Sequence, residues 1–147
     1  MPLQYLSFRA FVHATENEDK VVMAMEMATG LDEFSRVDVD GHHGNPIVIL
    51  EGDLRKKRDI RRFFSLMEGD DIIELLNSLE DRVEEDSHFY MRLDKQEAYL
   101  GRLRLAVDED VIQVRGAVVS YPKNREAGLA SMREFLQSFL DVPPSEK

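Results

Sequence analysis

The chain has 147 residues, of which 43% are hydrophobic and 33% charged, and this length is enough for one folded domain. Because it contains no cysteine, disulfide frameworks, thiolate zinc sites and cysteine nucleophiles are excluded, which fits a cytoplasmic location. The formal net charge of −10 argues, as a sum, against nucleic-acid binding, but the basic residues are concentrated in one stretch.

No stretch of the sequence has the pattern of a membrane span or an export signal. The apolar runs are shorter than the roughly 18 residues that a membrane span needs. The first residues, MPLQYLSFRAFV, lack a basic leader and a small-residue cleavage site. We therefore expect no signal peptide, no contact with a membrane and a cytoplasmic protein.

The N-terminal part of the chain predicts a strand, a helix and a second, short strand. Apolar residues alternate with polar ones over residues 6–13, which is typical of a half-buried strand. Thr15 and Glu18 form a capping box that predicts a helix start, and Gly30 is the expected end of that helix. Valines alternate with acids in residues 31–40, which indicates a short edge strand.

Residues 41–67 predict a shaped turn, a strand and a helix with one strongly basic side. Glycines and Pro46 bracket the turn, since glycine permits positive φ and proline fixes φ. Four consecutive apolar residues follow, which predicts a strand over residues 46–52 that is buried on both faces. The apolar stripe of the helix consists of Ile60, Phe63, Phe64 and Met67.

Two more helices are expected in the second half of the chain. Gly69 ends the basic helix, and Asp70 or Asp71 opens the next one, where negative charge suits the helix dipole. A last helix begins near Asn124, a suitable cap, and leaves a frayed tail over residues 142–147. Between these helices, alternating apolar residues predict three antiparallel strands, over residues 88–94, 102–107 and 111–121.

The order of these elements predicts an α+β fold. We expect a single-domain two-layer sandwich over residues 1–147, with a mostly antiparallel sheet and about four helices packed on one face. The opposite face of the sheet would then be partly open and partly basic. It would carry Arg9, Arg92, Arg104 and Arg115.

The turn that contains His42, His43, Gly44 and Asn45 is the first candidate site. Adjacent histidines are able to bind a metal or move a proton. Neither a His-Glu-x-x-His motif nor a cysteine accompanies them, so histidines that hydrogen-bond the backbone are the favoured interpretation. We predict no metal and no cofactor, and a contact from this turn to phosphate or base fits better.

The loop Leu93–Gly101 is the second candidate site. It lies between two predicted strands, and loops beside a rigid sheet often carry binding groups. Tyr99 is suited to stack on a base, and Lys95 to meet a phosphate. A turn in which Tyr99 packs half-buried explains the same residues equally well.

The basic stretch from residue 55 to residue 62 is the third candidate site. It holds six basic residues and one acid, and four of the six are arginines, whose guanidinium groups suit phosphate. The alternative is a solvated helix face whose charges pair internally. The sequence contains no phosphate-binding glycine loop, dinucleotide fingerprint or nucleophile elbow, so no catalytic motif is found.

Four stretches together resemble a known family: VHATENEDKV, GHHGNPIVIL with its basic helix, YMRLDKQEAYLGRLRL and SYPKNRE. They resemble archaeal proteins described as predicted exosome subunits, or as RNA-binding proteins with a double-stranded-RNA-binding-like fold. The resemblance covers residues 5–140 and implies RNA binding and a fold similar to the ribosomal protein that binds five-S RNA. It carries no catalytic residues over. The positions that it matches are Gly44, Asn45, Pro46, Asp94, Lys95, Gln96, Tyr99, Gly101, Pro122 and Lys123.

The favoured hypothesis is a non-enzymatic RNA-binding protein, an accessory to RNA processing or the exosome. One alternative is a protein-interaction module of a larger assembly that does not bind RNA directly. A weaker one is a metal-dependent nuclease that uses His42, His43 or Asp94. The predicted RNA contacts are Arg55, Lys56, Lys57, Arg58, Arg61 and Arg62, with Lys95, Tyr99, Arg102 and Lys123 as secondary contacts.

Overall fold

The computed structural model describes residues 1–41 and 44–140, so the predictions for His42, His43 and the tail over residues 142–147 lie outside the described residues. Five strands form one sheet in the order β2-β3-β1-β5-β4, and each neighbouring pair is antiparallel. The strands are β1 (Leu3–Val12), β2 (Ser35–Asp40), β3 (Pro46–Leu54), β4 (His88–Asp94) and β5 (Val111–Val118).

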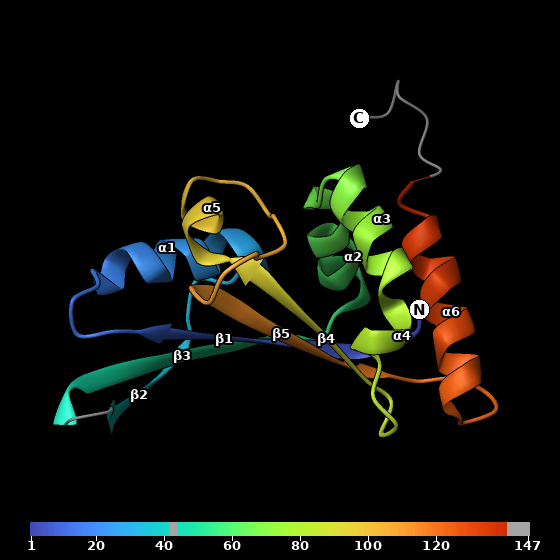
Figure 1. Cartoon of the computed structure of the whole chain (residues 1–147), viewed down its shortest axis with the longest axis horizontal. Coiled ribbons are helices and arrows are strands. Elements are labelled where there is room, and N and C mark those ends of the chain that lie inside the picture. The colour runs from blue at the N-terminus through green and yellow to red at the C-terminus, as the bar shows by residue number, and fades with distance from the viewer. Residues whose placement is uncertain (42–43, 141–147) are drawn as a thin grey trace.

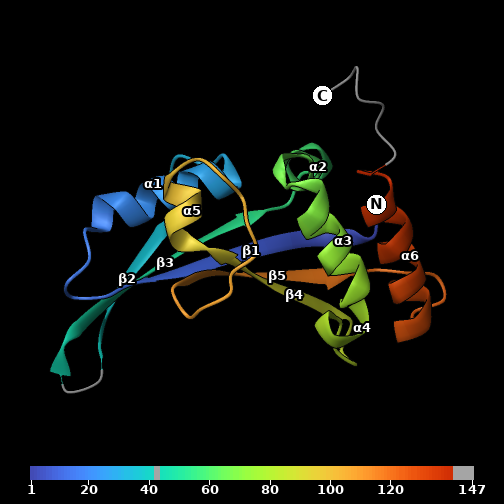
Figure 2. The ribbon, with the colours of Figure 1, turned by 45° about the horizontal axis from the view of Figure 1, so that its top comes forward.

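The helices form the second layer, on one side of the sheet (Figure 1). A view turned by 45° shows the same two groups of helices, one near each end of the sheet (Figure 2). The first group is α1 (Glu18–Thr29) and α5 (Lys95–Tyr99). The second is α2 (Lys57–Leu66), α3 (Gly69–Asn77), α4 (Leu79–Arg82) and α6 (Arg125–Gln137). The predicted α+β sandwich is confirmed, with six helices in the described residues rather than about four.

The core lies between the sheet and the helices, and it fixes the orientation of α2. Ile60, Phe63 and Phe64 of α2 are fully buried. The ring of Phe63 meets that of Phe8 on β1 edge-on at 5.2 Å, and Phe64 meets Phe135 of α6 at 5.3 Å. Burying each such ring contributes about 1.5–3 kcal/mol, so the apolar stripe holds α2 on the sheet with its charged side outward.

The ends of α1 test the predicted capping signals. The Asn17 side chain accepts hydrogen bonds from the backbone N–H groups of Asp19 and Lys20, so Asn17 caps the helix. The predicted capping box of Thr15 and Glu18 is therefore wrong, because Asn17 lies closer to the helix start and satisfies its free N–H groups. Gly30 ends the helix in the left-handed conformation, with φ 75°, as predicted.

Two strand predictions are wrong. Residues 102–107 do not form a strand, and only single bridges join Leu103 to Met67 and Leu105 to Leu93. The strand over residues 46–52 is not buried on both faces, since Ile47 and Ile49 are only half-buried. Ile47 and Ile49 are only half-buried because helices cover one face of the sheet and the other face stays open. Residues 102–107 instead dock through single apolar residues, and Arg104 pairs with the acids at the start of α3.

The remaining strand predictions are confirmed. β2 is an edge strand whose six residues are all exposed. β4 and β5 form at the predicted places, although β5 ends at Val118 rather than at Tyr121. None of the helices in the described part of the chain is both long and apolar enough to span a membrane.

Candidate nucleic-acid interface

The basic side of α2 and of the turn before it is fully on the surface. The buried stripe of α2 forces the intervening residues outward, because helical spacing separates the two sides. All six basic residues of the stretch are exposed. They are Arg55, Lys56, Lys57, Arg58, Arg61 and Arg62.

Few acids neutralise this basic surface. Arg55 lies 3.4 Å from a carboxylate oxygen of Asp53, and Arg58 lies 3.8 Å from one of Asp59. The other four basic residues form no ion pair with any described residue. Arg62 packs against Gly30 at the C-terminus of α1, where a Cβ would meet its Nη1 at 2.8 Å. A helix C-terminus favours a cation, so Arg62 also supports the fold.

Lys95 is placed differently from the surface contact that the sequence predicts. Its side chain is only 3% exposed. The ammonium donates a hydrogen bond of 2.7 Å to the Phe11 carbonyl and pairs with Glu16 at 3.1 Å and with Asp110 at 2.7 Å. All three of its N–H donors therefore have acceptors inside the fold, which leaves none for a phosphate.

The other secondary positions do not converge on α2. Tyr99 is half-buried on the helical side of the sheet, with the Lys20 ammonium 5.4 Å from its ring, as in the alternative interpretation of the loop. Arg102 is exposed but pairs with Glu68 at 3.4 Å. Lys123 is exposed in the loop before α6, at the end of the sheet far from α5 (Figure 1).

The described part of the turn lies apart from all of these positions. Gly44 and Asn45 are exposed at the tip of the hairpin that joins β2 to β3. Gly44 has φ 74°, which is the positive φ that the turn was predicted to need. His42 and His43 lie outside the described residues, so the structure does not test their role.

The open face of the sheet carries further basic residues. Arg9, Arg92 and Arg115 lie there, as the sequence predicts. Arg104 does not: it lies in the segment after α5 and pairs with Glu68, Asp70 and Asp71 near the start of α3.

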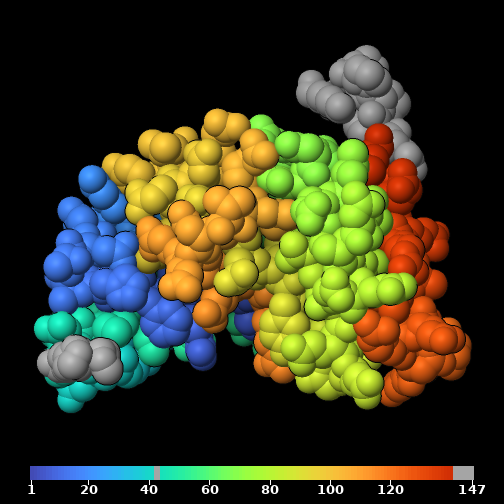
Figure 3. Space-filling view, viewed as in Figure 1, coloured from blue at the N-terminus to red at the C-terminus, as the bar shows by residue number. Residues whose placement is uncertain are grey.

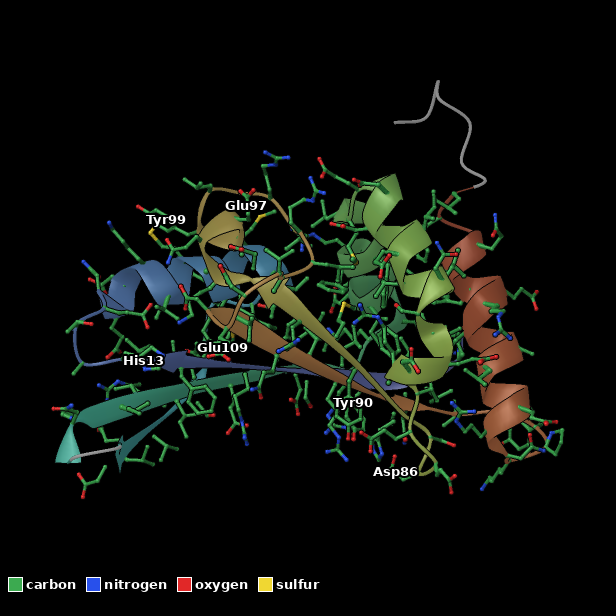
Figure 4. All side chains as sticks on the ribbon, in the orientation of Figure 1. His13, Asp86, Tyr90, Glu97, Tyr99 and Glu109 are labelled. Carbon is green, nitrogen blue, oxygen red and sulfur yellow. The ribbon has the colours of Figure 1, made fainter. Side chains whose placement is uncertain are left out.

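Two tyrosines of the open face are further candidate residues that were not predicted from the sequence. Figure 4 shows Tyr90 on the side of the sheet away from the helices and Tyr99 on the helical side. Tyr90 alternates with buried Phe89 and Met91 along β4, and Tyr5 alternates in the same way with buried Leu6 on β1. This period of two was the available signal, because it assigns both rings to the face that carries the arginines.

The structure therefore belongs to the α+β class, with one antiparallel sheet and an exposed basic surface in an acidic chain. A family model described as RNA binding matches residues 5–118. The chain belongs to this family.

Two curated proteins illustrate the likeness in sequence. RNA-binding protein PAB1135 of Pyrococcus abyssi is 35% identical over 142 residues, which cover 90% of this chain and 92% of that protein. Uncharacterized protein MJ0213 of Methanocaldococcus jannaschii is 38% identical over 137 residues, which cover 84% of this chain and 91% of that protein.

Two solved structures illustrate the likeness in fold, and both are described as DUF54 proteins. AF2318 of Archaeoglobus fulgidus has a TM-score of 0.79 at 35% identity, over 90% of this chain and 98% of that one. Mth689 of Methanothermobacter thermautotrophicus has a TM-score of 0.80 at 31% identity, over 92% of this chain and 99% of that one. The chain thus shares its fold with archaeal members of the family over nearly its full length.

Proposed function

We propose that this protein binds RNA, without catalysing a reaction, through the basic surface of α2. One observation carries the proposal: six exposed basic residues lie together in residues 55–62, and only two of them contact an acid among the described residues. In a chain of net charge −10, unpaired positive charge at one place is the feature that attracts a polyanion. The description of the family and the name of the relative PAB1135 support RNA as that polyanion.

The expected mode of binding is contact with phosphates. Guanidinium groups meet phosphate oxygens through two parallel hydrogen bonds, whereas lysine contributes a point charge. Such contacts position a nucleic acid but do not read its sequence. The protein should therefore bind many RNA sequences with similar affinity through α2.

A role as an accessory to RNA processing or the exosome is a further part of the proposal, and so is a cytoplasmic location. The first rests on the family resemblance of the sequence, and the second on the lack of cysteine in the chain. The test is whether exosome subunits co-purify with the protein from a native archaeal lysate. If they do, and ribonuclease treatment removes them, RNA connects the protein to the exosome. Co-purification that survives the ribonuclease would instead favour a protein-interaction module.

Fluorescence anisotropy with labelled RNA tests the role of α2. The double variant Arg58→Ala/Arg62→Ala should lose about tenfold or more in affinity for every RNA sequence alike, because phosphate contacts carry no sequence information. The control is Arg36→Ala/Arg133→Ala, which has the same net charge but removes arginines that pair with Glu18 and Glu80. Equal losses in the two double variants would contradict the proposal.

A further inference from the structure

Arginine and tyrosine side chains form one surface across the central strands on the open face of the sheet. The antiparallel register places Arg9 of β1 beside Gln113 of β5, and Gln113 beside Arg92 of β4. In the next row, Arg115 of β5 lies beside Tyr90 of β4. Directly opposed residues have Cβ atoms about 4.5–5.5 Å apart, so these side chains are in contact range of one another.

Two tyrosines on this face are already paired with guanidinium groups. The guanidinium of Arg55 lies 5.2 Å from the ring centroid of Tyr5, and that of Arg115 lies 5.9 Å from the ring centroid of Tyr90. Nε of Arg115 also donates a hydrogen bond of 3.2 Å to the Tyr90 hydroxyl, which raises the pKa of Arg115. Unpaired bases stack on rings and guanidinium planes of this kind.

The same strands line a groove of about 520 Å³ on this side of the molecule. Figure 3 shows that the lower outline of the protein is hollowed there. Four arginines and two carboxylates line the groove, which leaves it with an excess of positive charge. They are Arg9, Arg82, Arg92, Arg115, Glu51 and Asp81.

The excess charge of the groove comes from arginines that form no ion pair with an acid in the described part of the chain. Glu51 pairs with Arg9 at 3.0 Å, whereas Arg92 pairs with no acid among the described residues. Partial burial and repulsion from Arg92 lower the pKa of Arg82, although nearby acids oppose this effect. An anion between Arg82 and Arg92 would relieve their repulsion, so this is a suitable place for a phosphate.

We propose that this groove binds an unpaired segment of RNA. Its bases stack against the Arg115–Tyr90 pair, which lines the groove, and continue to the Arg55–Tyr5 pair on the same face of the sheet. One of its phosphates lies between Arg82 and Arg92. The inference rests on the proposed function and adds to it the class of RNA and a second contact surface. Arg55 connects the two surfaces, because it belongs to the basic stretch before α2 and lies over Tyr5 of the open face.

A single strand fits this groove better than a duplex does. A duplex keeps its bases stacked inside and presents phosphates and 2′-hydroxyl groups on a convex surface. The volume of the groove is in the range of about 300–1,000 Å³ that encloses a small ligand, and this suits a few unstacked nucleotides. The Tyr90 ring in the groove contributes to affinity only when bases are free to reach it.

The test measures, by fluorescence anisotropy, the affinity of the full chain for two labelled RNAs, a single strand and a duplex. The duplex has about 16 base pairs, the span that a double-stranded-RNA-binding domain covers. The unmodified protein should bind the single strand more tightly. Tyr90→Leu should weaken single-strand binding by about 5- to 150-fold, the loss expected for one stacked base, and leave duplex binding unchanged. Tyr90→Phe, which keeps the ring, should restore most of the affinity. Tyr99→Leu is the matched control, since Tyr99 is a half-buried tyrosine on the helical side.

The outcomes separate the inference from the proposed function. If Tyr90→Leu changes neither affinity while Arg58→Ala/Arg62→Ala weakens both, the inference is overturned and the proposed function stands. If neither RNA binds at low salt, both are overturned. Crosslinks from a photoreactive uridine in the single strand should fall on β1, β4 and β5 of the unmodified protein, and crosslinks confined to α2 would also overturn the inference.

Discussion

Residues 55–62 and residues 94–104 contain the same basic residue types, but the fold uses them in opposite ways. In the first segment, six basic side chains are exposed and pair with only two acids among the described residues. In the second, Lys95, Arg102 and Arg104 all pair with acids. Positive charge is therefore available to a polyanion only where the fold leaves it unpaired, and a count of basic residues does not reveal this.

Arg102 and Arg104 of the second segment are neutralised because they meet the acidic start of α3, whereas Lys95 pairs with Glu16 and Asp110. Arg104 donates hydrogen bonds to Asp71 at 2.9 Å and to Asp70 at 3.1 Å, and it pairs with Glu68. These contacts raise the pKa of Arg104, the hydrogen bond with Asp71 being the largest cause. Glu68, Asp70 and Asp71 have carboxylate oxygens within 4.8 Å of one another, so the arginine also relieves their mutual repulsion.

The largest effect should come from the buried lysine. Lys95→Met keeps the aliphatic stem but removes the ammonium group that hydrogen-bonds the Phe11 carbonyl and pairs with two carboxylates. We expect a loss of about 2–4 kcal/mol in the free energy of unfolding, measured with urea, because a broken buried pair leaves uncompensated charge. Lys57→Met, at an exposed and unpaired position, is the control and should change stability by less than about 0.5 kcal/mol. Equal effects of the two substitutions would contradict the contrast between the segments.

A smaller loss of stability should follow Arg104→Gln. The substitution leaves Asp71, whose side chain is 11% exposed, without its charged partner. We expect a loss of about 1–2 kcal/mol, since the pair is only partly buried, with RNA affinity nearly unchanged. If Arg104→Gln weakened RNA binding as strongly as Arg58→Ala/Arg62→Ala does, the second segment would have to be part of the interface.

The smallest effect concerns how the free energy of unfolding falls at acid pH. Partial burial would raise the pKa of Asp110, but hydrogen bonds from Lys95 and Gln96 outweigh it and lower the pKa below the ordinary 3.8. A carboxyl group with a lowered pKa adds stability above its unfolded pKa, and this stability is lost as the pH falls through the folded value. Asp110→Asn should therefore flatten the fall in stability below pH 3.8, as followed by circular dichroism, and leave the slope between pH 5 and 7 unchanged. A change confined to the neutral range would contradict this assignment.

The pattern of apolar and polar residues along the chain predicted the helices and strands better than it predicted the residues available to bind RNA. The period of two located β4 and β5, and helical spacing located α2 and its buried stripe. The same alternation failed for residues 102–107, because their apolar residues dock singly and Arg104 turns toward α3. A pattern of burial does not distinguish a strand from a loop that is held by ion pairs.

The role of Lys95 was hidden for a different reason. Its partner Glu16 precedes it in the sequence and its partner Asp110 follows it, both outside the predicted loop. Only the folded chain brings the two carboxylates to the Lys95 ammonium. The open face was easier to predict, since strand alternation places Arg9, Arg92 and Arg115 on one side. The same alternation places Tyr5 and Tyr90 on that face, but their interest as stacking groups follows only from the folded structure, in which the helices cover the other face.

The most direct test of the account is the salt dependence of RNA affinity for the unmodified protein. If about six phosphates of a single strand are neutralised, log K should fall with log salt at a slope of about −4. The Arg58→Ala/Arg62→Ala variant should give a slope shallower by about 1.4, because two contacts are lost. A slope near zero, or one that the variant does not change, would contradict the claim that the unpaired basic residues of α2 bind RNA.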